Sequence, residues 1–248
     1  ASSPAPCANR APWHQDLMVP QAHLCRFHGQ FGSGIWDLLM SCCPYTASYL
    51  TLQRAVLAAS TSAMMSVFDH GAPPPCPAMF NMAAYVLEAG LKTPDKVALS
   101  LLTPEGSENW TYAALRAAVL GTGRGFLDTG LCAGDVVLMR LGNTVDFPLA
   151  FLGALSVGLI PVPTSAALTL SETSRIIADM SPAAILHSPD VACPADPRVV
   201  SLEVLRAMRA LPAAEIHMGD PNRLGYVIYT SGTSGSPRAV GHAHRAIW

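Results

Sequence analysis

The sequence has little charge and few aromatic residues. Charged residues make up 13% and aromatic residues 7% of its 248 positions, and the formal net charge is −2. So weak a charge excludes strong electrostatic attraction to nucleic acid or to an anionic membrane, and we expect neither as a partner. Half of the residues are hydrophobic, which excludes a disordered chain and is typical of a globular protein with a real core.

Charge is absent altogether from FPLAFLGALSVGLIPVPTSAALTLS, residues 147–171. A helix that spans a membrane needs about 20 apolar residues, so length alone does not exclude one here. Pro161 and Pro163 exclude it, because each breaks a helix interior. The pattern predicts a buried helix over Phe147–Val157, a turn at Gly158 and a short strand, LIPVP. This unit is typical of a parallel sheet covered by helices, and we expect no transmembrane segment.

The seven cysteines lack a regular spacing. Their number is odd, no zinc-binding pattern is present, and no apolar signal peptide opens the chain. Four lie within the first 43 residues, which resembles a secreted disulfide framework, but free thiols in a reducing cytoplasm are the simpler interpretation. The four are Cys7, Cys25, Cys42 and Cys43, and the other three are Cys76, Cys132 and Cys193.

Residues 1–64 also lack a periodic pattern, and a proline-rich segment follows them. We predict a poorly ordered extension over 1–64 and a folded domain over 65–248. Either Met64 or Met65 could be a natural start. A small helical cap formed by GIWDLLMSC and YLTLQRAVLAA is the alternative.

From residue 80 onward, helical and strand patterns alternate. Four helices are predicted. The first is NMAAYVLEAGL and ends at Gly90, and the second is a long helix that Thr111 caps. The third covers residues 147–157, and the fourth is SETSRIIADM with Ser171 as its N-cap. Strands are predicted at KVALSLL, GDVVLMRLG, LIPVP, AAILHS, RVVSL and GYVIYT. This alternation predicts an α/β fold of layered, largely parallel sheets with flanking helices.

Two short motifs suggest functions that their context does not support. GTGRG, residues 121–125, lacks the third glycine of a dinucleotide-binding fingerprint and follows a helix. We interpret it as a segment that ends a helix or packs closely through small residues. His242 and His244 have no further metal ligand nearby in the sequence, so a role at the surface or at the start of a helix is the better interpretation.

The segment TSGTSGS, residues 230–236, follows an apolar strand and precedes a proline and an arginine. Its glycines permit close backbone approach, exposed amides bind anions, and hydroxyl groups donate to phosphate oxygens. Arginine adds a permanent forked cation. We therefore predict a polyphosphate-binding loop rather than a flexible linker. Its residues are Thr230, Ser231, Gly232, Thr233, Ser234, Gly235 and Arg238.

The stretch YTSGTSGSPRAVGHAHR closely resembles the signature of the adenylate-forming enzymes, YTSGTTGxPKGVxHxH, which Tyr229–His244 match in order. TPDKVAL, WTYAAL, GLCAGDVVLMRLGN and FLGALSVGLIPVPTS are similar to earlier landmarks of that family, so the resemblance covers about residues 78–248. Arg238 replaces the family's lysine and keeps the charge. Ala239 replaces a glycine and restricts the loop slightly.

The resemblance implies the N-terminal part of an ATP-dependent ligase that converts a carboxylic acid, fatty or aromatic, into acyl-AMP and then acyl-CoA. ATP, magnesium and coenzyme A would be its ligands, with Thr233 and Ser234 near the magnesium shell. Residues 65–248 would be an incomplete AMP-binding domain. The family's catalytic lysine would follow Trp248, so we expect no catalytic residue within this chain and no activity from it alone. The alternatives are a non-catalytic remnant and the adenylation domain of a peptide synthetase.

Overall fold

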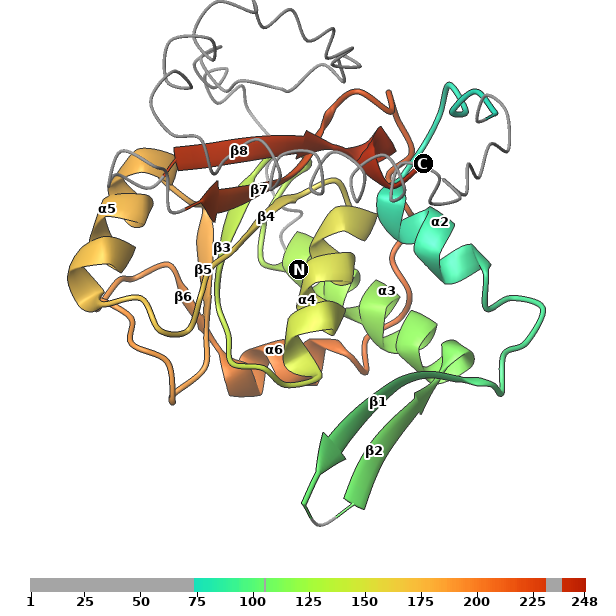
Figure 1. Ribbon diagram of the computed structural model, residues 1–248, viewed down its shortest axis with the longest axis horizontal. Coiled ribbons are helices and arrows are strands. Elements are labelled where there is room, and N and C mark those ends of the chain that lie inside the picture. The colour runs from blue at the N-terminus through green and yellow to red at the C-terminus, as the bar shows by residue number, and fades with distance from the viewer. Residues whose placement is uncertain (1–73, 105, 231–237) are drawn as a thin grey trace, which may run out of the picture. The chain divides into compact units, whose positions relative to one another are not determined.

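A computed structural model describes residues 74–104, 106–230 and 238–248 (Figure 1). Residues 76–248 belong to one compact unit. The expected boundary between an extension over 1–64 and a domain over 65–248 lies outside the described residues, so it stays a prediction.

The centre of this unit is a parallel sheet of four strands in the order β4-β3-β5-β6. Leu138 of β3 lies between Val162 of β4 and Ile185 of β5. Every residue of β3 is buried, as expected for a central strand of a sheet with both faces covered. The predicted α/β class is confirmed. The strands span Val136–Arg140 (β3), Ile160–Pro163 (β4), Ala184–His187 (β5) and Val199–Ser201 (β6).

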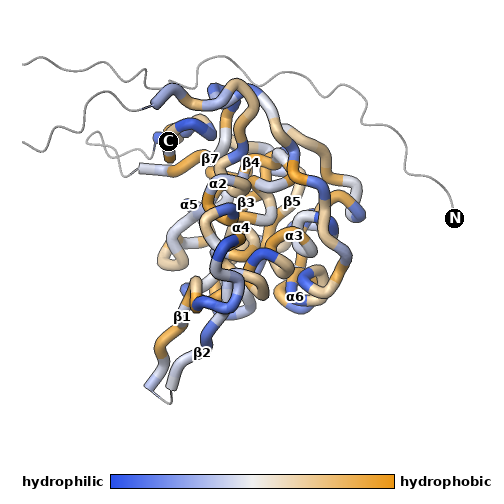
Figure 2. The backbone as a smooth tube through the Cα atoms, turned by 90° about the vertical axis from the view of Figure 1, so that its right-hand side faces the viewer, coloured by the Kyte–Doolittle hydropathy of each residue, from blue (hydrophilic) through white to orange (hydrophobic). Residues whose placement is uncertain are grey.

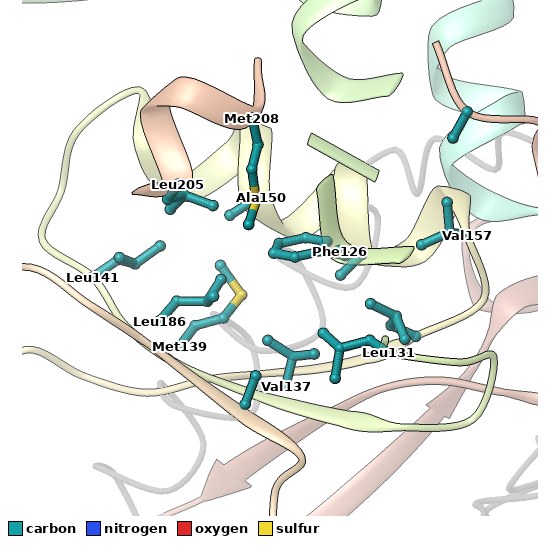
Figure 3. Packing of buried hydrophobic residues seen from close by; sticks show 14 residues of the cluster. Phe126, Leu131, Val137, Met139, Leu141, Ala150, Val157, Leu186, Leu205 and Met208 are labelled. Atoms are coloured by element: carbon teal, nitrogen blue, oxygen red, sulfur yellow. The ribbon is translucent and has the colours of Figure 1, made fainter. Parts of the chain in front are cut away.

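Helices α3, α4 and α6 cover one face of the sheet. Because side chains of a strand alternate between faces, Val137 and Met139 point toward these helices. Figure 3 shows Phe126 and Met208 directed at this layer of the sheet. The helices span Tyr112–Asp128 (α3), Asp146–Ser156 (α4) and Leu202–Met208 (α6), and α6 is an element that the sequence patterns did not predict.

The other face packs against helix α5, Leu170–Met180, and the strand β7, Leu224–Thr230. Strand β7 pairs antiparallel with β8, Arg238–Ala243, to form the β7–β8 hairpin. A second hairpin, formed by β1, Val97–Thr103, and β2, Gly106–Thr111, extends away from the sheet in Figures 1 and 2. The prediction of a largely parallel arrangement therefore holds for the central sheet, whereas both flanking strand pairs are antiparallel.

Helix starts follow local hydrogen bonding. The hydroxyl of Thr111 accepts the backbone N–H of Ala114 at 3.2 Å, so the predicted cap of α3 is confirmed. The predicted cap of α5, Ser171, is wrong. Thr169 caps this helix, because its hydroxyl accepts the N–H of Glu172 and the Glu172 carboxylate in turn accepts the N–H of Thr169, at 2.8 Å.

The GTGRG segment lies inside α3, which continues to Asp128, so it does not end the helix. The segment does pack closely through its small residues, which was the alternative interpretation. A Cβ atom on Gly121 would lie 2.7 Å from the carbonyl oxygen of Arg209, and one on Gly123 would lie 2.8 Å from the hydroxyl of Ser156. Glycine is required because any side chain would push α3 away from these neighbours.

A buried carboxylate joins helices α4 and α6. Asp146 is the first residue of α4 and is fully buried. Its two oxygens accept hydrogen bonds from Arg206, at 3.0 and 2.9 Å, and one oxygen also accepts from Arg209. The guanidinium of Arg209 lies over the ring of Trp110 on β2, 5.9 Å from its centre. One carboxylate thus connects α4, α6 and the β1–β2 hairpin.

The uncharged stretch, residues 147–171, contributes to helix α4, a turn at Gly158 with φ of 79°, and strand β4. The predicted order of helix, turn and strand is confirmed. No helix in the described part of the chain has both the length and the apolar character that crossing a bilayer requires. In Figure 2 the hydrophobic residues, coloured orange, gather where the buried strands lie.

Two of the cysteines carry the free thiols that were expected, namely Cys76 and Cys193. Cys132 is disulfide-bonded, so the prediction is wrong for this residue.

Replacing Gly121 tests the close packing of α3. A glycine-to-alanine change in a helix ordinarily stabilises it by about 1 kcal/mol. In Gly121→Ala the new methyl group would meet the carbonyl oxygen of Arg209, so we expect the free energy of unfolding in urea to fall by about 1–3 kcal/mol. Arg124→Ala, on the exposed side of the same helix, should change it by less than about 0.5 kcal/mol. A stabilised Gly121→Ala protein would contradict the packing described above.

Candidate phosphate-binding site

The β7–β8 hairpin brings two of the predicted site residues together. Thr230 ends β7, Arg238 begins β8, and the two are paired in the strand register. The hydroxyl of Thr230 lies 3.5 Å from the carbonyl oxygen of Arg238. Both residues are exposed, and we call this end of the hairpin its tip. The other predicted residues, Ser231, Gly232, Thr233, Ser234 and Gly235, lie outside the described residues.

The tip offers a cation and a hydroxyl for an anionic ligand. No ion pair is formed by Arg238 within the described ranges, so its guanidinium remains available for a bidentate contact with phosphate oxygens. Thr230 supplies a further donor beside it. This arrangement fits a phosphate group, which requires charge and several donors within a short distance.

Tyr229, next to the tip, points to the opposite face of β7 and packs against the cluster that contains Ile176 and Met180 of α5. Its hydroxyl is buried and has no hydrogen-bond partner in the described part of the protein. Burial, and then the charge of Asp179, raise the pKa of Tyr229 to about 12. The side chain is therefore a neutral anchor between hairpin and helix.

Aromatic stacking holds the opposite end of the hairpin, which we call its base. The ring of Tyr226 lies parallel to that of His242, with 4.7 Å between the ring centres. Phe151 of α4 contacts the same tyrosine edge-on at 5.5 Å. His242 is therefore a stacking residue on β8.

His244, two residues further on, has a different environment. It is buried and begins the short 3₁₀ helix η1, His244–Ile247, so the expected role at a helix start is confirmed and the surface role is wrong. Its Nδ1 atom accepts the backbone N–H of Met82 at 3.1 Å. Burial, and then the charges of Arg223 and His217, lower the pKa of His244 to about 4. The imidazole is consequently neutral at physiological pH.

A buried polar network surrounds this histidine. Asn81 caps helix α2, Met82–Glu88, by accepting the N–H groups of Ala83 and Ala84. Its amide donates to the carbonyl oxygens of Leu155, at 2.8 Å, and of His217, at 2.9 Å.

Arg223 extends the same network. Its guanidinium donates to the carbonyl oxygens of Phe80, at 2.6 Å, and of His217, at 3.0 Å. The base of the hairpin is thus joined to α2 and to the end of α4 by hydrogen bonds rather than by apolar packing alone.

Within the described ranges, no three histidine, cysteine or acidic side chains gather as metal ligands would. His242 and His244 themselves diverge, because one faces Tyr226 and the other faces the backbone of Met82.

Sequence patterns did not identify Asn81, Arg223 or the role of His244. Asn81 directly precedes the helical segment MAAYVLE, and asparagine is among the strongest N-cap residues, so that signal was present. Arg223 and His244 had no local signal for their contacts with the start of α2, because Phe80 and Met82 lie more than 140 positions away in the sequence.

The fold and the site define an α/β protein in which a parallel sheet supports an antiparallel hairpin with a basic, hydroxyl-bearing tip. The family model described as AMP-binding enzyme matches residues 87–248, and the chain therefore belongs to the AMP-binding enzyme family.

Its relatives are of two kinds. A plipastatin synthase from Bacillus subtilis is 28% identical over 160 residues, which are 64% of this chain and 6% of that protein. The long-chain-fatty-acid–CoA ligase FadD13 of Mycobacterium tuberculosis is 27% identical over 159 residues, which are 58% of this chain and 31% of the ligase. The chain thus spans less than a third of either relative.

Solved structures agree in fold. A benzoate CoA ligase from Burkholderia xenovorans matches with a TM-score of 0.55 and 22% identity, over 67% of this chain and 35% of that one. The N-terminal subdomain of NpsA from Klebsiella oxytoca matches with a TM-score of 0.60 and 17% identity, over 69% and 44% of the two chains. At these identities the comparison supports the fold alone.

Titration of His244 should make stability depend on pH. The unfolded chain binds a proton on this histidine below about pH 6.5, whereas the folded protein resists protonation down to about pH 4. The stabilisation is therefore fully present above pH 6.5 and is lost as the pH falls toward 4. We expect a decrease on the order of 3 kcal/mol in the free energy of unfolding over this range.

The matched variant is His244→Asn, whose amide oxygen can accept the Met82 N–H bond but does not titrate. Urea unfolding of both proteins between pH 7.5 and 4 isolates the contribution of this residue from that of every other group. Parallel stability profiles for the two proteins would show that His244 is not held neutral by the fold.

Proposed function

We propose that the protein activates a carboxylic acid with ATP, forming acyl-AMP and pyrophosphate. A carboxylate oxygen attacks the α-phosphorus, the bond to the bridging oxygen breaks, and pyrophosphate leaves with the electron pair. The observation that carries this proposal is the pairing of Thr230 with Arg238 at an exposed hairpin tip, within the segment that the AMP-binding family model matches.

In this proposal the tip binds the β- and γ-phosphates of ATP. Negative charge builds up on the leaving pyrophosphate as the reaction proceeds, so a cation fixed beside it stabilises the transition state more than the bound substrate. Arg238 would supply that cation, and Thr230 would donate a hydrogen bond to a phosphate oxygen. Ser231, Gly232, Thr233, Ser234 and Gly235 would complete the loop around the phosphates.

Magnesium would enter with ATP as its phosphate complex and offset the same charge. Hydroxyl oxygens are suitable neighbours for the water shell of this hard cation, and we assign Thr233 and Ser234 to that position. Arg238 fits the phosphates and not the metal, since a guanidinium repels a cation.

The acyl group would then pass to a thiol, and we favour coenzyme A as the acceptor. Two relatives support this choice, the FadD13 ligase and the 4-hydroxybenzoate–CoA/benzoate–CoA ligase of Rhodopseudomonas palustris, which is 28% identical over 152 residues. The plipastatin synthase supports the second candidate, an adenylation domain that loads a carrier protein. Supply of coenzyme A or of a carrier protein to the enzyme with preformed acyl-AMP distinguishes the two. Both would operate in the cytoplasm, where ATP is abundant.

Arg238 provides the test of the phosphate-binding role, in the longest form of the protein that its gene encodes. Arg238→Ala should lower the rate of carboxylate-dependent ATP–pyrophosphate exchange roughly ten- to hundredfold, because a charge-assisted hydrogen bond contributes about 1.5–3 kcal/mol. The apparent affinity for ATP should change less, since the lost contact is stronger in the transition state. Arg238→Lys should keep most of the activity.

The matched control is Arg245→Ala. Arg245 is exposed, and its side chain donates a hydrogen bond to that of Asn222 at 2.9 Å, so its loss should leave the exchange rate within about twofold of normal. Thioester formation from preformed acyl-AMP should not need Arg238, because pyrophosphate has already left. Equal damage to both steps in Arg238→Ala would argue against phosphate binding at the tip.

A further inference from the structure

Strand β8 connects two residues of very different exposure. Arg238 begins the strand at the exposed tip, and His244 directly follows its last residue, Ala243, with only 1% of its surface exposed. A strand rises about 3.3 Å per residue, so the five steps from Arg238 to Ala243 span roughly 17 Å. A rotation of a few degrees at the base therefore moves the tip by about an ångström.

The contact at the base has a specific chemical reason. The first N–H groups of a helix have no acceptor within the helix. Asn81 accepts those of Ala83 and Ala84, and the N–H of Met82 remains. The Nδ1 atom of His244 accepts that group at 3.1 Å. A neutral imidazole with its proton on Nε2 is required for this bond, because a protonated Nδ1 would face another donor.

The partner strand is shaped to admit the histidine ring. A Cβ atom on Gly225 of β7 would lie 3.3 Å from the backbone nitrogen of His244 and 3.4 Å from its Cδ2 atom. The backbone of β7 therefore packs directly on the residue. Tyr226, next along β7, is held between His242 and Phe151. Both strands of the hairpin are thus fixed at the base, whereas Thr230 and Arg238 at the tip are exposed.

We infer that His244 is a positioning residue for ATP, which fixes the base of the β7–β8 hairpin to helix α2 and thereby sets the place of Arg238 at the tip. The inference rests on the proposed phosphate-binding role of the tip. It assigns no contact with the substrate to His244. Displacement of a catalytic contact by about 1 Å can lower a rate by as much as a hundredfold, so the anchor is expected to affect the reaction and not stability alone.

The test compares His244→Leu, which removes the acceptor, with His244→Asn, which keeps one near the position of Nδ1. The longest form of the protein that its gene encodes is used, and rates are divided by the folded fraction measured by circular dichroism at the assay temperature. We expect His244→Leu to lower kcat/KM for ATP in pyrophosphate exchange roughly tenfold, and His244→Asn to stay within about threefold of normal.

A double variant separates positioning from a general loss of integrity. If His244 acts through Arg238, adding His244→Leu to Arg238→Ala should lower kcat/KM less than about twofold further, because the interaction to be positioned is already gone. A full tenfold further loss, or a normal kcat/KM per folded molecule in His244→Leu alone, overturns the inference. If His244→Leu does not fold, His242→Leu takes its place, because it loosens the same base by removing the stack on Tyr226. A full tenfold further loss in the double variant with Arg238→Ala, or a normal kcat/KM per folded molecule in His242→Leu alone, would then overturn the inference.

Hydrogen exchange of the backbone distinguishes failure of the anchor from failure of the proposed function. His244→Leu should exchange faster than normal at Met82 and through residues 238–243, and His244→Asn should not. Faster exchange together with a normal rate for Arg238→Ala would mean that the anchor exists but the tip does not bind phosphates. Unchanged hydrogen exchange in His244→Leu would show that His244 does not fix the base of the hairpin, whatever the kinetics of Arg238→Ala.

Discussion

The buried carboxylate of Asp146 is the interaction on which the arrangement of the helices depends. An unpaired carboxylate in an apolar interior is very unfavourable, so its position requires cations beside it. Arg206 and Arg209 supply them, and both lie at the end of α6 or just beyond it. Because Asp146 begins α4, this one group fixes α4 relative to α6. Arg209 also faces Trp110, so the β1–β2 hairpin is held by the same charge.

Helix α4 connects this ion pair to the β7–β8 hairpin. Its first residue is fixed by the arginines, and its last turn presents the carbonyl oxygen of Leu155 to the amide of Asn81. Midway along the helix, Phe151 contacts Tyr226 at the base of the β7–β8 hairpin. Gly123 of α3 lets this helix approach α4 closely, because a Cβ atom there would lie 2.8 Å from the hydroxyl of Ser156. A shift of α4 would therefore disturb α3 as well as α6. The orientation of the hairpin base therefore depends on the contact of Phe151 with Tyr226 as well as on the hydrogen bond between His244 and the backbone of Met82.

The sequence predicted those elements that local chemistry specifies. The apolar stretch with two prolines indicated α4 and β4, and Thr111 indicated the start of α3, because each signal lies within a few residues of its effect. The error at Ser171 arose because Thr169 is also a capping residue, and only Thr169 has a glutamate three positions later. The burial of His244 could not be predicted, since its hydrogen-bond partner, the N–H of Met82, lies 162 positions away. Strand β8 was not predicted either, although it pairs with the neighbouring strand β7.

The two ends of the β7–β8 hairpin combine opposite physical requirements. A group that binds phosphate must stay accessible, and an exposed arginine side chain by itself has no fixed position. A group that determines geometry must be buried and saturated with hydrogen bonds, which would make it useless as a ligand for a substrate. In the proposed function, an exposed Arg238 at the start of β8 and a buried His244 directly after its last residue satisfy both requirements, because the pairing of β8 with β7 connects the two ends. In this proposal the tip stays exposed to its ligand while the buried base sets its position.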